Sequence, residues 1–144
     1  MGKINCGGSC TTTVAANTPV TLTANPGGGL FSGWRGACNG ADLNCRLNGN
    51  DQLDVTATFK PVFTLSIGRG GSGTVTGDQP GAFSTQIACG SNCSAKFPQG
   101  TIVTLTATPP AGHNFVNWAG ACSGTAPTCS VTISKDTQAQ ANFK

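Results

Sequence analysis

Residues 115–122 read FVNWAGAC and residues 31–38 read FSGWRGAC, so the chain contains the same aromatic stretch twice. An alternating apolar and Thr pattern that ends near a Pro precedes each stretch, and a second Cys and a closing Phe follow it. The copies are offset by 84 residues over this stretch and after it, and by 83 residues at the first Cys pair, Cys6 and Cys10 against Cys89 and Cys93. The one-residue difference falls in the turns around Pro26 and Pro109, where a duplicated fold tolerates an insertion. The chain therefore contains two copies of one unit.

Eight cysteines occupy matching positions in the two copies. Four in one copy allow three pairings, and the sequence alone does not choose among them. We expect local pairing, because each pair brackets a segment rich in small or polar residues that can turn tightly: Cys6–Cys10, Cys38–Cys45, Cys89–Cys93 and Cys122–Cys129. A zinc site is the alternative, but zinc ribbons favour two residues between ligands, whereas here three or six intervene. Disulfides, with no metal and no cofactor, are the prediction.

The composition indicates the compartment and excludes several partners. Domains of about 60 to 80 residues bury little surface, and disulfides formed in oxidising compartments compensate for a small core. Charged residues make up 9% of the 144-residue chain and the net charge of +3 is scattered, which argues against a nucleic-acid partner. No apolar run is long enough for a membrane helix. We expect a secreted or cell-surface protein, and a segment of a longer one, because no apolar leader follows the first residues.

Strand patterns dominate the sequence. Apolar residues alternate with Thr or Ser over several short runs, and period-two alternation predicts strands with one buried face. These runs are 20–24, 53–59, 63–67, 74–76, 103–107 and 131–133. Gly and Pro separate them, and no window has a helical period. The prediction is an all-β protein of two tandem, small, antiparallel domains stapled by disulfides.

The two copies differ at their starts. The second copy opens with a predicted hairpin, residues 63–67 and 74–76, that has no counterpart before Cys6 in the first copy. We therefore predict domains at residues 1–60, lacking the hairpin, and 61–144, complete. Pro61 stiffens the joint between them, so a rigid, elongated pair is expected. The missing hairpin leaves an edge that a neighbouring strand could complete.

The repeated motifs resemble those of the divergent InlB B-repeat family. Three stretches of the second copy recur in order in the first copy. Residues 101–109 (TIVTLTATP) correspond to residues 19–26, residues 115–122 to residues 31–38, and the closing Ala141 to Phe143 to the end of residues 55–59. The resemblance covers nearly the whole chain. It implies compact, β-grasp-like modules in tandem on bacterial secreted or surface proteins, without catalytic activity of their own. A small immunoglobulin-like sandwich is the alternative fold, because no helical segment is visible.

The two tryptophans are the candidate ligand-binding residues. Trp34 and Trp118 each lie three residues after a Phe, and on an undistorted strand an odd separation places the two rings on opposite faces. An exposed indole would offer a platform for a sugar ring. The alternative is a structural Trp that shields a disulfide, with a bulge at Gly33 changing the register.

Residues suited to catalysis are scarce. The chain has one His, His113, and no Glu or Tyr, and Asp51 and Asp54 have no counterparts in the second copy. No nucleophile motif accompanies them, so we expect no enzyme and no catalytic residue. Three functions remain: a structural or adhesive repeat, a carbohydrate-binding module that uses Trp34 and Trp118, and a fibre or adhesin subunit completed by a neighbour's strand. The expected partners are other domains of the parent protein, neighbouring copies or a polysaccharide.

Overall fold

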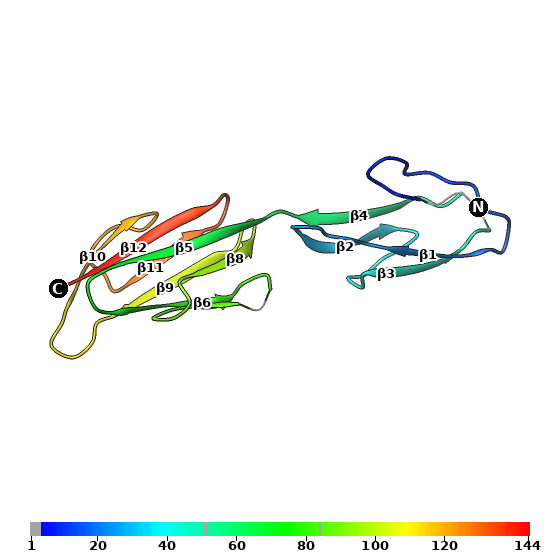
Figure 1. Ribbon diagram of the computed structural model, residues 1–144. Coiled ribbons are helices and arrows are strands. Elements are labelled where there is room, and N and C mark those ends of the chain that lie inside the picture. The colour runs from blue at the N-terminus through cyan, green and yellow to red at the C-terminus, as the bar shows by residue number, and fades with distance from the viewer. Residues whose placement is uncertain (1–3, 51, 84) are drawn as a thin grey trace. The chain divides into compact units, whose positions relative to one another are not determined.

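A computed structural model of the protein describes residues 4–50, 52–83 and 85–144, and the described residues form twelve strands (Figure 1). None of these residues is helical, so the described part holds no helix that could cross a membrane. The all-β prediction is confirmed. The chain divides into two compact units: unit one comprises Met1–Gly27 and Phe31–Phe59, and unit two comprises Lys60–Lys144 together with Gly28–Leu30.

Unit two contains eight strands in two four-stranded sheets. The strands are β5 (Val62–Gly70), β6 (Thr74–Pro80), β7 (Gln86–Cys89), β8 (Ser94–Pro98), β9 (Ile102–Thr108), β10 (Phe115–Gly120), β11 (Thr128–Thr132) and β12 (Thr137–Phe143). One sheet has the order β10-β12-β5-β8 and the other has the order β11-β9-β6-β7. The β5–β6 hairpin therefore supplies an inner strand to each sheet, as Figure 1 shows.

The strand directions correct one expectation. All pairs in unit two are antiparallel except β12 and β5, which run parallel with Ala139 opposite Ile67. Two strands far apart in sequence become neighbours because the chain passes from β11 in one sheet to β12 in the other. The sequence patterns predicted purely antiparallel domains because a local alternation does not report strand direction.

The core of unit two lies between its sheets and draws on both. Leu65 and Phe97 come from one sheet and Val75, Val103 and Leu105 from the other, and each of these side chains is fully buried. In β9 every second residue points inward, as the Val-Thr-Leu-Thr pattern predicts. Burying side chains of this size stabilises a fold by about 1.5–3 kcal/mol each. Two facing sheets around one core match the predicted sandwich alternative, and the described residues lack the helix of a β-grasp fold.

The described residues of unit one form four strands. They are β1 (Pro19–Thr23), β2 (Leu30–Gly36), β3 (Asn44–Asn48) and β4 (Val55–Lys60), in two-stranded sheets β1–β3 and β2–β4. Residues 4–15 contain only an isolated bridge between Asn5 and Ser9. Among the described residues three side chains are buried in the core of unit one, against seventeen in unit two.

The two units nevertheless share local backbone geometry in detail. Gly100 donates its N–H to Ile133 O (2.7 Å), and Asn17 donates to Gly49 O (3.1 Å) at the matching position. The turn residues Gly100 and Asn17 both have positive φ, 87° and 59°. The next residues, Thr101 and Thr18, accept hydrogen bonds in return from Ile133 N and Gly49 N. The duplication seen in the sequence is therefore a duplication of structure.

Candidate functional site

A tryptophan and a disulfide hold the same loop in unit two. Cys122 and Cys129 are bridged and close the loop between β10 and β11. Trp118 donates its backbone N–H to Gly124 O (2.9 Å) and its indole Nε1–H to Ala126 O (2.9 Å), so both donors bond inside that loop. We call this arrangement the Trp–disulfide clamp.

Unit one contains the same clamp. Trp34 donates its backbone N–H to Gly40 O (2.9 Å) and its Nε1–H to Asp42 O (2.7 Å), and Cys38 and Cys45 are bridged around them. The donors and the acceptor positions match those of unit two one for one. Conserved geometry with changed loop residues shows that the clamp depends on backbone carbonyls and not on particular side chains.

The Phe that precedes each Trp packs against it. The ring centroids of Phe115 and Trp118 are 5.4 Å apart and those of Phe31 and Trp34 are 5.3 Å apart. An undistorted strand would have separated these rings, but the register of β10 shifts between Phe115 and Asn117. A bulge adds one residue and returns the Trp to the Phe's side. In unit one Gly33, with φ of 139°, occupies the equivalent position.

The clamp excludes the predicted sugar platform. Trp34 is 8% exposed and Trp118 is 3% exposed, and each indole N–H is already bonded to a loop carbonyl. A sugar ring needs an open aromatic face, and neither indole offers one. The expectation of an exposed ligand platform therefore does not hold for these two buried indoles, which follow the structural alternative. In unit two the register shift before Trp118 turns its side chain into the core.

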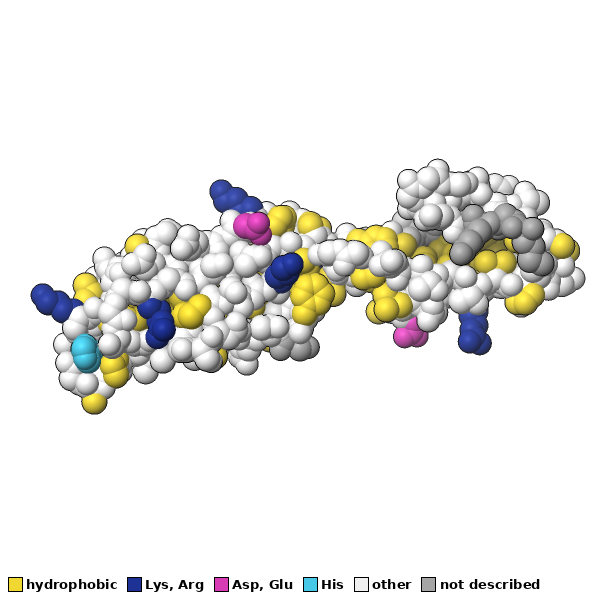
Figure 2. Space-filling view, in the orientation of Figure 1, with side chains coloured by type: hydrophobic (Ala, Val, Ile, Leu, Met, Phe, Trp, Pro, Cys, Tyr) yellow, Lys and Arg dark blue, Asp and Glu magenta, His cyan; other side chains and the backbone are white. Residues whose placement is uncertain are grey.

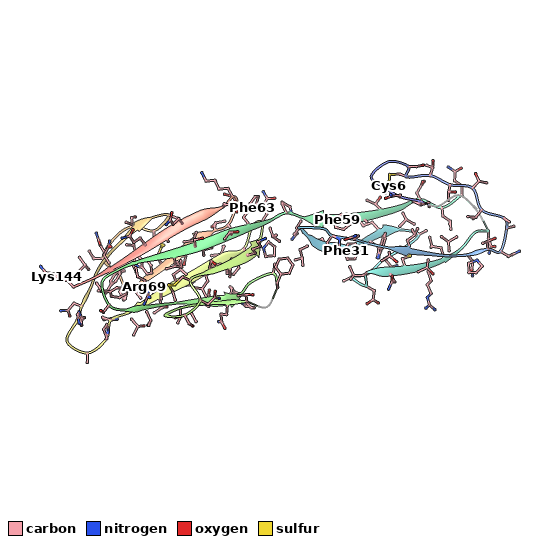
Figure 3. All side chains as sticks on the ribbon, viewed as in Figure 1. Cys6, Phe31, Phe59, Phe63, Arg69 and Lys144 are labelled. Atoms are coloured by element: carbon pink, nitrogen blue, oxygen red, sulfur yellow. A yellow bond between two sulfur atoms is a disulfide. The ribbon has the colours of Figure 1, made fainter. Side chains whose placement is uncertain are left out.

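All four expected bridges are present, and the described cysteines include no free thiol. Their surroundings differ between the units. Cys89 is fully buried at the end of β7 and Cys93 precedes β8, whereas Cys6 and Cys10 are both exposed in a segment without strands. Figure 3 labels Cys6 in this segment of unit one.

The titratable side chains are dispersed. His113 and Asp54 are exposed and Asp51 lies outside the described residues, while the part that the structure describes contains no group of three His, Cys, Asp or Glu side chains suited to a metal. Figure 2 shows the charged side chains scattered over the visible face, with one basic and one acidic side chain next to each other. No catalytic grouping emerges from these positions.

Two carboxylates that the sequence patterns missed have structural roles in unit two. Asp136 accepts from Thr64 N (2.8 Å) and Asp78 accepts from Thr104 N (2.7 Å), so each side chain bonds the backbone of a distant strand. Both contacts join segments more than 25 residues apart, and no local motif could have indicated them. A depression beside Arg69 is lined by Cys93, Thr108 and Pro109 among others, and Arg69 Nη1 donates to Gly73 O there (2.7 Å).

The most unusual surface of the protein is the open side of unit one, which we define as the unpaired edges of β1 and β4 together with residues 4–15. Strand β1 pairs only with β3, and β4 pairs only with β2, among the described residues. Phe59 at the end of β4 is 43% exposed, although it packs against Phe31 with ring centroids 5.6 Å apart. Figure 3 shows these two rings together, and Figure 2 shows apolar side chains at the surface of this unit.

Comparison with known protein families identifies the class of module that this scaffold represents. The divergent InlB B-repeat domain matches residues 1–62 and again residues 63–144. The chain belongs to this family, as its repeated motifs indicated, and consists of two consecutive members. No curated protein and no solved structure matches the chain.

Proposed function

We propose that the protein is a non-catalytic, extracellular repeat module that acts as a structural spacer in a bacterial secreted or surface protein. The family membership and four disulfides support an oxidising location. The described residues offer no cluster of reactive groups, and the polar side chains with long-range partners bond the protein's own backbone.

One observation supports this proposal: the two units share core and turn features but differ in their exposed residues. The clamp and the turn at Asn17 and Gly100 occur in both units. The exposed Arg35 beside Trp34, in contrast, is replaced by Ala119 beside Trp118. A duplicated binding site would keep its exposed contacts, whereas a duplicated spacer needs only its core and turns.

The remaining candidates rank below the spacer. Polysaccharide binding through the indoles loses its basis with their burial, and adhesion through another surface has no residue that supports it. Assembly by strand complementation has one observation in its favour, because β1 and β4 each have a single strand partner among the described residues.

Small-angle X-ray scattering on the full chain tests the spacer. A spacer keeps its ends at a fixed separation, and Pro61 between β4 and β5 limits backbone freedom at the joint. We expect one narrow range of maximum dimensions, which widens when Gly-Ser-Gly-Ser is inserted after Pro61. Wild-type scattering as broad as that of the insertion variant would contradict the proposal, and so would retention of the protein by an insoluble polysaccharide.

A further inference from the structure

The loop that the clamp closes in unit one contains an Asn-Gly dipeptide. Asn39 and Gly40 follow the bridged Cys38, and both are exposed. Gly40 supplies the carbonyl that accepts from Trp34 N (2.9 Å), so this residue is part of the clamp itself. A chemical change between Asn39 and Gly40 therefore acts directly on the clamp.

An Asn that precedes a Gly reacts with the following backbone, and this makes Asn a thermolabile residue. The backbone nitrogen of the Gly attacks the side-chain carbonyl carbon of the Asn, the side-chain nitrogen leaves as ammonia, and a cyclic imide remains. Water then opens the imide at either carbonyl, so the product is Asp or isoaspartate. Isoaspartate continues the chain through the former side-chain carboxyl, which adds a carbon atom to the main chain. Gly favours the attack because it has no side chain and permits many backbone conformations.

The structure leaves the reacting groups accessible at Asn39. Gly40 lies in an isolated bridge that uses its carbonyl, and among the described residues no acceptor bonds its N–H. A Cβ added at Gly40 would meet nothing within 4 Å, so the backbone is open on that side. The nitrogen is thus available for attack without the loss of a hydrogen bond within the protein.

The second Asn-Gly dipeptide of the sequence, Asn48 and Gly49, provides an internal comparison. Gly49 donates its N–H to Thr18 O (3.0 Å), and a Cβ added there would lie 2.6 Å from Val14 Cγ2. Asn48 is the last residue of β3 and pairs with Pro19. The Gly49 nitrogen has to break its hydrogen bond before it attacks, and this local opening costs free energy. The structure therefore favours reaction at Asn39 over reaction at Asn48.

We propose that Asn39 is a site of spontaneous deamidation and isomerisation, and that its isoaspartate product releases the Trp–disulfide clamp of unit one. The added carbon displaces Gly40 O from Trp34 N, because the bridge from Cys38 to Cys45 closes the loop around them. A hydrogen bond weakens steeply when its distance and angle leave a narrow range.

The proposed change is confined to unit one. Ser123 precedes Gly124 at the matching position of unit two, and Ser has no side-chain amide that could form the imide. Gly124 O nevertheless accepts from Trp118 N as Gly40 O does from Trp34 N. The clamp therefore does not require Asn at this position, and the reactivity is independent of the spacer function.

Incubation of the full chain at constant pH tests the site of reaction. Peptide mass spectrometry with chromatographic separation of the two products measures deamidation at Asn39 and Asn48, in the native chain and in the reduced, denatured chain. We expect Asn39 to react about fivefold or more faster than Asn48 in the native chain, because the net contribution of one hydrogen bond separates them. The two rates should be comparable in the denatured chain. Equal native rates, or a faster reaction at Asn48, would overturn the proposal.

Amide hydrogen exchange at Trp34, followed by NMR, tests the effect on the clamp. We expect exchange to be about tenfold or more faster in the purified isoaspartate form than in the unreacted chain. Asn39→Asp carries the new charge without the added carbon, and Asn39→Ser copies Ser123, so both variants should keep the original exchange rate. Fast exchange in Asn39→Asp would assign the effect to charge, and slow exchange in the isoaspartate form would show that the clamp tolerates the longer chain. Either result would overturn the proposed release.

Discussion

Unit one and unit two contain the same Trp–disulfide clamp but differ in what surrounds it. In unit two the clamp joins a core of seventeen buried side chains, and in unit one only Ala24, Trp34 and Cys38 are buried among the described residues. The same local hydrogen bonds therefore exist with and without a full core. The comparison teaches that turns and disulfides specify the local geometry, whereas the larger core accompanies the two four-stranded sheets of unit two.

The consequence is an expected difference in stability. Two-stranded sheets are marginal in water, and three or more strands over an apolar face are needed for independent stability. Unit one meets that condition only by packing its two small sheets together. We expect it to rely on its disulfides and on Trp34 more than unit two relies on the same features.

The largest predicted effect comes from removing the indole. Trp118→Ala should lower the free energy of unfolding of unit two by about 3–5 kcal/mol and leave it folded. Trp34→Ala should unfold unit one, because the indole is the largest of its three buried side chains. Hydrogen exchange in the full chain would show rapid exchange of β1–β4 in the second variant only.

Phe substitutions provide the control for the indole experiment. Trp34→Phe and Trp118→Phe keep an aromatic ring and lose the N–H bond to Asp42 O or Ala126 O. Each should cost about 0.5–1.5 kcal/mol, because a part-buried hydrogen bond is lost. Persistent protection of β1–β4 in Trp34→Ala would show that unit one is held together by something other than its indole.

A smaller effect is expected when the leucines at the same position of the two copies are replaced by Ala. Leu105 is fully buried and Leu22 is half-buried at the same position of the repeat. Leu105→Ala should therefore cost unit two about 3 kcal/mol, and Leu22→Ala should cost unit one about 1 kcal/mol. Denaturant midpoints from hydrogen exchange would measure both. Equal losses would mean that the open side of unit one is covered in solution.

Two disulfides with identical spacing offer a sharper contrast. Cys89 and Cys93 lie between paired strands, whereas Cys6 and Cys10 lie in a segment without strands. In the chain-entropy description a bridge across five residues is worth about 2 kcal/mol, provided that the closed loop is ordered on folding. Replacing both cysteines by Ala should therefore cost unit two about 2 kcal/mol and unit one close to nothing. A comparable loss in both units, read from their unfolding midpoints, would show that residues 4–15 are docked.

Sequence patterns predicted the parts of the fold that depend on neighbouring residues. Alternation located β1, β4, β5, β6, β9 and β11, and the short Cys spacings led to the bridges that are present. Short strands such as β3, β7 and β8 were missed. Residues 44–48 read NCRLN, in which a Cys and a single Leu give too little alternation to identify a strand.

Features set by distant contacts could not be predicted. The parallel pairing of β12 with β5 depends on how the chain crosses between sheets, and the carboxylate of Asp136 bonds a residue 72 positions away. The burial of Trp34 and Trp118 depended on a bulge whose presence the Phe-to-Trp spacing left open. The hairpin of unit two was visible in the sequence, but its central place in both sheets was not.

The smallest predicted effect concerns the turn that both units share. Gly100 and Asn17 occupy the same position with φ of 87° and 59°, and a Cβ added at Gly100 would meet nothing within 4 Å. Backbone strain is therefore the only cost of a side chain there, about 1–2 kcal/mol for Ala in the left-handed region and less for Asn. We expect Gly100→Ala to lower the stability of unit two by about 1 kcal/mol and Gly100→Asn by less.

The reciprocal change in unit one should be close to neutral. Asn17→Gly relieves the strain but increases the freedom of the unfolded chain, so the two contributions oppose each other and the net change should stay within about 0.5 kcal/mol. Asn17→Ala keeps the strain without the tolerance of Asn and should cost about 1 kcal/mol. Thermal unfolding of the four variants would check the ranking. If Gly100→Asn destabilised unit two as much as Gly100→Ala, the equivalence of the two turns, and with it the structural duplication on which the comparison rests, would be wrong at this position.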